Sequence, residues 1–117
     1  MPGLRDVVQH LVQREGVELV VVVSNDGLPI DHATRSGTDP DALAAMIPAL
    51  NQCARQVGAA ASSGELTNAV LEFGDRLLVL SALNDNNNLL ILTAPDTNIG
   101  ELLYDIRQHR PAIASLL

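Results

Sequence analysis

The segment from Asp85 to Asp96 carries acidic and amide side chains that could bind a cation, and its length equals that of an EF-hand calcium loop. Such residues occupy its first, third and twelfth positions. Its fifth and sixth positions are Leu89 and Leu90, where an EF-hand needs a ligand and a glycine. We therefore interpret residues 84–88 as a polar hairpin turn and expect no calcium there.

The three histidines and the single cysteine do not form a metal-binding pattern. His10, His32 and His109 fall on an exposed helix face, an edge strand and a helix end, and the sequence has no Cys-x-x-Cys. We expect all three imidazoles to be solvated. Cys53 lies beside the buried stripe of a predicted helix, which is typical of a cysteine that serves in packing.

The motifs of nucleophilic catalysis and nucleotide binding are absent as well. Ser62 and Ser63 have no G-x-S-x-G context and fit the end of a helix. Asp39 and Asp41 could act as a carboxylate pair, but helix capping accounts for both positions. The sequence has no lysine, no G-x-G-x-x-G and no Walker loop. We expect a protein that is not an enzyme and has no cofactor, no metal and no small-molecule substrate.

The composition predicts a single acidic globular domain that covers residues 1–117. The chain has 117 residues, of which 47% are hydrophobic, and a formal net charge of −7. An acidic domain without a basic cluster is a poor match for nucleic acid or for an anionic membrane. The sequence contains one cysteine, no signal peptide and no apolar run of about 20 residues. These features predict a cytoplasmic protein.

The elements that hold these residues start with an amphipathic helix from about Leu4 to Glu15, which Gly16 should end in a left-handed conformation. Another helix should follow the capping residues at 95–98. Pro111 should end or kink this last helix. The residues after it then form a final apolar turn through Ile113, Leu116 and Leu117.

The second helix begins at Asp39-Pro40, with an acidic cap and a proline in its first turn, frays through residues 59–61 and ends by Gly64. Pro48 should kink it, because proline removes one backbone hydrogen bond. Its predicted buried stripe is Leu43, Met46, Ile47, Leu50, Ala54 and Val57, with Cys53 beside them.

The hydrophobic pattern also predicts five strands, and three of these are apolar almost without interruption. The predicted ranges are Val17–Ser24, Leu28–Ala33, Leu66–Phe73, Leu77–Leu83 and Leu89–Thr93. A strand with one solvated face alternates, so continuous apolar strands indicate a sheet that is covered by helices on both faces. The mixed second and third strands should be the edges, and Pro29 suits an edge. The α/β fold predicted is α-β-β-α-β-β-β-α, with a five-stranded antiparallel sheet of order 2-1-5-4-3.

This arrangement resembles the roadblock/LC7 family. The matching pieces are the first helix into 17–23, the turn at 24–28, the Asp39-Pro40 helix start, and the segment 95–100 before the last helix. The resemblance implies a homodimer in which the third strands pair into one continuous sheet and the second helices lie together on one face. Bacterial members such as the MglB-type polarity proteins often regulate a small Ras-like GTPase, and eukaryotic relatives act as dynein light chains or scaffold subunits.

Two functions remain in competition. One is a regulator of a small Ras-like GTPase, and the other is a binding or sensory module related in shape to profilin or PAS folds. The scarcity of aromatic residues disfavours a small-molecule pocket. The expected dimer interface is the third strand, with Leu66, Thr67, Asn68, Ala69, Val70, Leu71 and Glu72. The expected partner-binding face of the second helix is Asp41, Ala45, Ala49, Gln52, Arg55 and Gln56.

Overall fold

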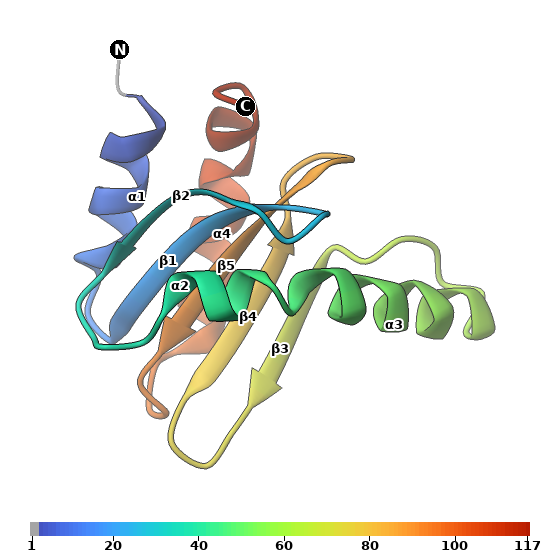
Figure 1. The fold of residues 1–117 in the computed structure, drawn as a ribbon. Helices are drawn as coiled ribbons and strands as arrows, with labels where there is room; N and C mark the ends of the chain where they lie inside the picture. The colour runs from blue at the N-terminus through green and yellow to red at the C-terminus, as the bar shows by residue number, and fades with distance from the viewer. Residues whose placement is uncertain (1–2) are drawn as a thin grey trace.

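A five-stranded antiparallel sheet lies between two layers of helices in the computed structural model, which describes residues 3–117 (Figure 1). The elements in chain order are α1 (Leu4–Val12), β1 (Val17–Ser24), β2 (Pro29–Thr34), α2 (Pro40–Ala44), α3 (Ile47–Ala60), β3 (Asn68–Glu72), β4 (Leu77–Ala82), β5 (Asn87–Thr93) and α4 (Ile99–Ala114). Helices α1 and α4 cover one face of the sheet, and α2 and α3 lie on the other. Over residues 3–117, every helix is too short or too polar to span a lipid bilayer.

The strand order is β2-β1-β5-β4-β3, which confirms the order predicted from the apolar pattern. The three apolar strands are central, with Val21 opposite Leu90 and Val79 opposite Ile91. Their side chains alternate between two cores, because successive residues of a strand point to opposite faces. Val20, Val22 and Ile91 pack beneath α1 and α4, whereas neighbouring residues of the same strands pack beneath α2 and α3.

Helix α1 is shorter than predicted, since it ends at Val12 and Gln13 forms its C-cap. Gly16 does adopt the predicted left-handed conformation, with φ of +87°, but lies three residues beyond the cap. A Cβ atom at Gly16 would lie 2.5 Å from the Thr97 hydroxyl, so glycine is needed both for its backbone and for this close approach.

The prediction of one kinked second helix is wrong, because the segment forms two helices, α2 and α3, joined at Ala45 and Met46. Asp39 caps α2 as predicted, and its Oδ1 accepts a hydrogen bond of 2.9 Å from the Asp41 amide. Pro48 lies in the first turn of α3, where a helix has no partner for an amide hydrogen. The proline therefore starts a new helix here instead of bending an existing one.

Part of the predicted buried stripe on the second helix is exposed. Met46 and Val57 are 62% and 61% exposed, and Cys53 is also exposed. Ile47 is the buried residue of α3. Figure 1 shows that α3 extends past the edge strand β3, which accounts for the exposure of residues in its second half, such as Val57. The second half of α3 thus has an apolar side with no sheet of its own protomer beneath it.

The last helix continues through Pro111 to Ala114, so of the two predicted outcomes, an end or a kink, the end is wrong. Because proline has no amide hydrogen, the Arg107 carbonyl lacks its usual hydrogen bond within the helix. The loss of one such bond near the end of a helix does not stop the helix from continuing. Ile113 is fully buried, and the predicted final turn forms, with the Leu116 and Leu117 amides donating to the Ile113 and Ala114 carbonyls, although both leucines are exposed.

Gly27 offers a test of how the β1–β2 turn supports the α2–α3 junction. Its φ is +85°, and a Cβ atom there would lie 3.0 Å from the Ala44 carbonyl oxygen and 3.1 Å from Pro48 Cδ. We expect Gly27→Ala to lower the free energy of unfolding by about 2 kcal/mol or more, since strain at positive φ adds to overpacking. Urea denaturation followed by far-ultraviolet circular dichroism measures this change.

The matched control is Gly64→Ala. Gly64 has a similar φ of +81°, but a Cβ atom added there would have no neighbouring atom within 4 Å. The variant should therefore lose only about 1 kcal/mol from backbone strain. Equal losses at the two positions would contradict the proposed support of the helix junction.

Candidate protein-interaction surface

Strand β3 leaves one side of its backbone open. The Phe73 amide donates to the Arg76 carbonyl at 2.9 Å, and the Thr67 carbonyl accepts from the Ala82 amide at 3.0 Å. The backbone amide and carbonyl groups of the odd-numbered residues of this strand therefore point toward β4. Since the hydrogen-bonding groups of successive residues point in opposite directions, Asn68, Val70 and Glu72 direct theirs outward. The edge thus presents three backbone donors and three acceptors to a further strand.

An apolar groove runs beside this edge, between the α2–α3 segment and the sheet. Its volume is about 400 Å³, and its walls include Met46 and Ile47 from the helices and Leu71 and Phe73 from the region of β3. Met46 and Phe73 are both more than half exposed. Farther along α3, beyond the groove, Cys53 and Val57 are exposed. Edge, groove and overhanging helix form one apolar-lined surface, which we call the β3–α3 surface.

All six residues expected to bind a partner are exposed, but they do not share one surface. Asp41 belongs to α2 and Ala45 to the junction, while the other four lie on α3. Ala49 lines the apolar groove, whereas Arg55 lines a polar cleft on another side of the helix. The break between α2 and α3 thus divides the expected partner-binding face, which the sequence pattern predicted to be continuous along one helix.

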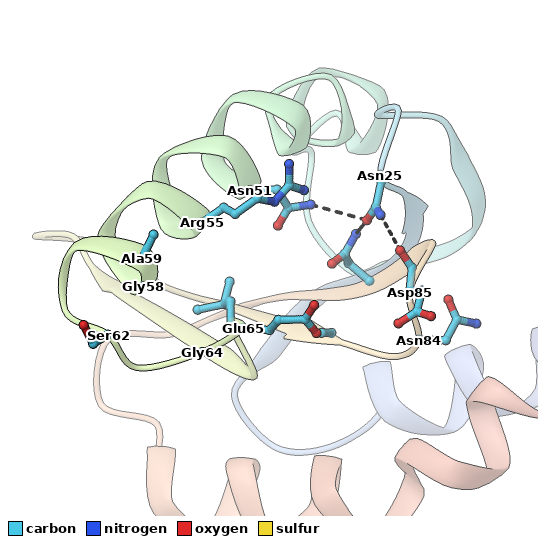
Figure 2. Close-up of a pocket in the computed structure, with 13 residues that line it drawn as sticks. Asn25, Asn51, Arg55, Gly58, Ala59, Ser62, Gly64, Glu65, Asn84 and Asp85 are labelled. Carbon is cyan, nitrogen blue, oxygen red and sulfur yellow. Dashed lines mark hydrogen bonds between the residues drawn. The ribbon is translucent and has the colours of Figure 1, made fainter.

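The polar cleft lies between α3 and the turns at one end of the sheet, and Figure 2 shows its lining. Asn25 is its central residue. Its Nδ2 donates to the Asp85 carbonyl at 2.7 Å, and its Oδ1 accepts from Asn88 at 2.8 Å and, at 3.5 Å, from Asn51. This one side chain therefore connects the β1–β2 turn to the β4–β5 turn and to α3, a connection that was not predicted from the sequence.

The cleft has a volume of about 540 Å³ and contains both a cation and carboxylates, with Arg55 on one wall and Glu65 and Asp85 on others. Its lining lacks a histidine, a cysteine or an aromatic side chain. Such a site can offer hydrogen bonds and charge to a polar surface.

The other candidate residues occupy the positions that helix and turn chemistry assigns to them. The run at 84–88 starts as the predicted hairpin turn, with Asn84 Oδ1 accepting from the amides of Asn86 and Asn87 at 2.8 and 2.9 Å, but Asn87 and Asn88 already belong to β5. Ser62 has a φ of +52° just beyond the end of α3. Among residues 3–117, no group of three or more His, Cys, Asp and Glu side chains is arranged to hold a metal ion.

The structure does bring two of the histidines together. The rings of His10 on α1 and His109 on α4 have centroids 6.2 Å apart, and His109 is half-buried instead of exposed. The Nδ1 of His109 lies 2.8 Å from the Asp105 carbonyl oxygen. Arg14 joins the same two helical segments through ion pairs with Asp105 and Glu101. The two histidines are far apart in the sequence, so no local pattern predicts that they lie close together.

Comparison with known protein families identifies the family of this chain. The profile of the Roadblock/LC7 domain matches residues 4–93, from the start of α1 to the end of β5. The chain belongs to the Roadblock/LC7 family. Among proteins with curated descriptions, none matches the chain significantly.

Solved structures of Roadblock/LC7 proteins share the whole fold. A Roadblock/LC7 domain from Streptomyces avermitilis has 23% sequence identity and a TM-score of 0.85, over 96% of this chain and 95% of that one. MglB from Myxococcus xanthus has 16% identity and a TM-score of 0.87, over 97% and 93%. An MglB with a tetrameric arrangement has 11% identity and a TM-score of 0.88, over 97% and 86%.

The polar cleft generates a prediction about Asn25. Asn25→Ala should lower the free energy of unfolding by about 1–3 kcal/mol, because it leaves the buried Asn88 amide without its acceptor. Thermal or urea denaturation followed by circular dichroism provides the measurement. Asn86→Ala is the control, because that side chain is exposed and makes no hydrogen bond within residues 3–117; it should change stability by less than about 0.5 kcal/mol. Equal effects would mean that Asn25 does not hold the turns together.

Proposed function

We propose that this Roadblock/LC7 domain is a non-enzymatic homodimer that regulates a small Ras-like GTPase. The observation that carries the proposal is the β3–α3 surface, an open strand edge next to an apolar groove in a chain of this family. The structural similarity to MglB proteins also supports a regulatory role. The GTPase would bind the α3 helices once they are paired.

The case for a homodimer starts from the hydrogen-bonding groups of β3. A second β3 strand would satisfy the outward backbone groups of Asn68, Val70 and Glu72, which otherwise face water. It would also bring the overhanging half of each α3 above the sheet of the other copy, covering Met46 and Val57. A symmetric pair places the same patch on both partners, so one surface supplies both halves of the interface. In this arrangement the expected interface residues, 66–72, form its centre.

The case for the partner face rests on the residues that such a dimer would leave uncovered. Gln52, Arg55 and Gln56 are exposed on α3 and offer hydrogen bonds and a positive charge. Asp41 and Ala45 extend the expected face toward α2, whereas Ala49 lines the groove that the dimer would cover. Two such helices around a two-fold axis form a composite platform, and one GTPase that straddles the axis would occupy both halves. We therefore propose one GTPase per dimer.

The alternative function, a binding or sensory module without a GTPase, has one observation in its favour. The polar cleft has a volume within the usual range of small-molecule sites, about 300–1,000 Å³. Its lining has no aromatic side chain, and ligand pockets rely on such walls for affinity. Polar groups at a surface cleft also suit a protein partner, which is the function we favour.

The dimer is tested by Val70→Pro. The amide hydrogen of Val70 points away from β4, so proline removes a donor from the open edge without removing a hydrogen bond inside the protomer. We expect the wild-type protein to sediment as a dimer at micromolar concentration and the variant as a folded monomer, measured by analytical ultracentrifugation. Val70→Ala keeps the donor and should remain dimeric. A monomeric wild type would refute the dimer.

The partner face is tested by Arg55→Glu. Arg55 forms no ion pair within residues 3–117, so its charge is free to meet an acidic partner. Reversal should weaken binding of a small Ras-like GTPase encoded in the same gene neighbourhood by more than about 1 kcal/mol, because arginines are frequent hot spots. Titration calorimetry measures the affinity, and sedimentation should show an intact dimer.

Arg107→Glu is the control for this experiment. Arg107 is exposed on α4, on the opposite side of the sheet, and its substitution changes the net charge by the same amount. It should leave the affinity unchanged. If neither Arg55→Glu nor Gln52→Glu alters the affinity, the GTPase binds elsewhere.

A further inference from the structure

Arg110 of α4 is a half-buried cation without a carboxylate. Its Nη2 donates to Asn68 Oδ1 at 3.0 Å and to Ser81 Oγ at 2.6 Å, and both acceptors are neutral. Its Nε is buried and has no hydrogen-bond partner. Within residues 3–117, no carboxylate lies at ion-pair distance from its guanidinium. A buried guanidinium donor without a partner is costly, and an acidic neighbour would both accept its hydrogen bond and compensate its charge.

Glu72 has the complementary charge and points to the same face of the sheet. Asn68, Val70 and Glu72 share a face because side chains of a strand repeat every two residues. That face is the one covered by α4, since Asn68 contacts Arg110 and Val70 is opposite Val79 in the core beneath α4. Glu72 is exposed and has no ion pair among the described residues. Within one copy it is about 13 Å along the strand from Asn68, at about 3.3 Å per residue.

The symmetry of the proposed dimer limits how two β3 strands can pair. If α3 of both copies lies on the same face of the joined sheet, the two-fold axis is perpendicular to the sheet and paired residues share a face. In each possible register one residue lies opposite the same residue of the other copy. This central residue can be Ala69, Val70 or Leu71. The register centred on Val70 is the one that pairs all three outward-facing residues within the strand, with Asn68 opposite Glu72 of the other copy.

We infer that two copies of this chain pair with Val70 opposite Val70, and that Arg110 of each copy forms an ion pair with the partner's Glu72. Directly opposite residues have Cβ atoms about 5 Å apart, so the partner's Glu72 would lie beside the Asn68 side chain that Arg110 already contacts. Two such pairs form by symmetry. The inference rests on the proposed homodimer and adds its register and the residues that specify it.

Charge reversal tests the ion pair. Glu72→Arg places a cation beside Arg110 and should weaken dimerisation at least about tenfold, measured as the dimer dissociation constant by sedimentation. Combining Glu72→Arg with Arg110→Glu in the same chain should recover most of the lost affinity, because each pair is re-formed with its charges exchanged. Glu65→Arg is the control, since it makes the same charge change outside the strand. A double variant no tighter than Glu72→Arg alone, in protein that remains folded by circular dichroism, would overturn the ion pair.

Disulfide trapping tests the register without relying on charge. In a Cys53→Ser background, Val70→Cys should cross-link to its own copy, because Cα atoms of a hydrogen-bonded antiparallel pair lie about 5.5 Å apart, within disulfide reach. Ala69→Cys and Leu71→Cys should cross-link poorly, since each is displaced by two residues from its own copy. A dimer that cross-links best through position 69 or 71 would overturn the register and leave the proposed function standing. A monomeric protein would refute both.

Discussion

Both faces of the sheet must be covered, because its central strands are apolar on both sides, and this requirement determines where the helices lie. In β1, β4 and β5 nearly every side chain is buried, so neither face can be left to water. Helices α1 and α4 cover one face with a long stripe of buried residues. On the other face, the short α2 and the first turns of α3 cover β1, β5 and β4. The remaining length of α3 extends past the sheet.

This uneven covering explains why the open edge, the groove and the exposed helix residues occur together. The second face has fewer buried helix residues, and at its margin Leu71 and Phe73 of the β3 region line a groove that no other element of the described chain fills. Apolar residues in a stripe on a helix normally indicate burial, and those on the far half of α3 keep that pattern while being exposed. An apolar stripe that stays exposed within one chain is typical of a protein–protein interface.

The sequence predicted the sheet well because continuous apolar strands, turn residues and edge prolines are local signals with one consistent solution. The order 2-1-5-4-3 followed from placing the mixed strands Leu28–Ala33 and Leu66–Phe73 at the edges. The helix break at Ala45–Met46 was not predictable in the same way. A proline in the middle of an apolar stripe is compatible with a kink or with a new start, and the close contact of Gly27 with Ala44 and Pro48 decides between them. That contact joins residues far apart in the sequence.

The candidate surface was predictable only in part for a related reason. Periodicity places Met46 and Val57 on the inner side of a helix, but it does not say whether the helix is longer than the sheet beneath it. The network around Asn25 joins residues from three separate segments, and none of the segments alone carries a signal for it. Amide side chains in turns are so common that no local pattern distinguishes this one from the others.

The position of α3 connects these features, because the groove and the polar cleft both border it. Gly27 and Asn25 belong to the same turn, and they hold α3 at two points, near Pro48 and at Asn51. A partner that changes the angle of α3 would therefore alter the groove at one end and the cleft at the other. In the proposed dimer, the groove contributes to pairing and Arg55 of the cleft to partner binding. The turn at residues 24–28 thus contacts α3 beside both the groove and the polar cleft.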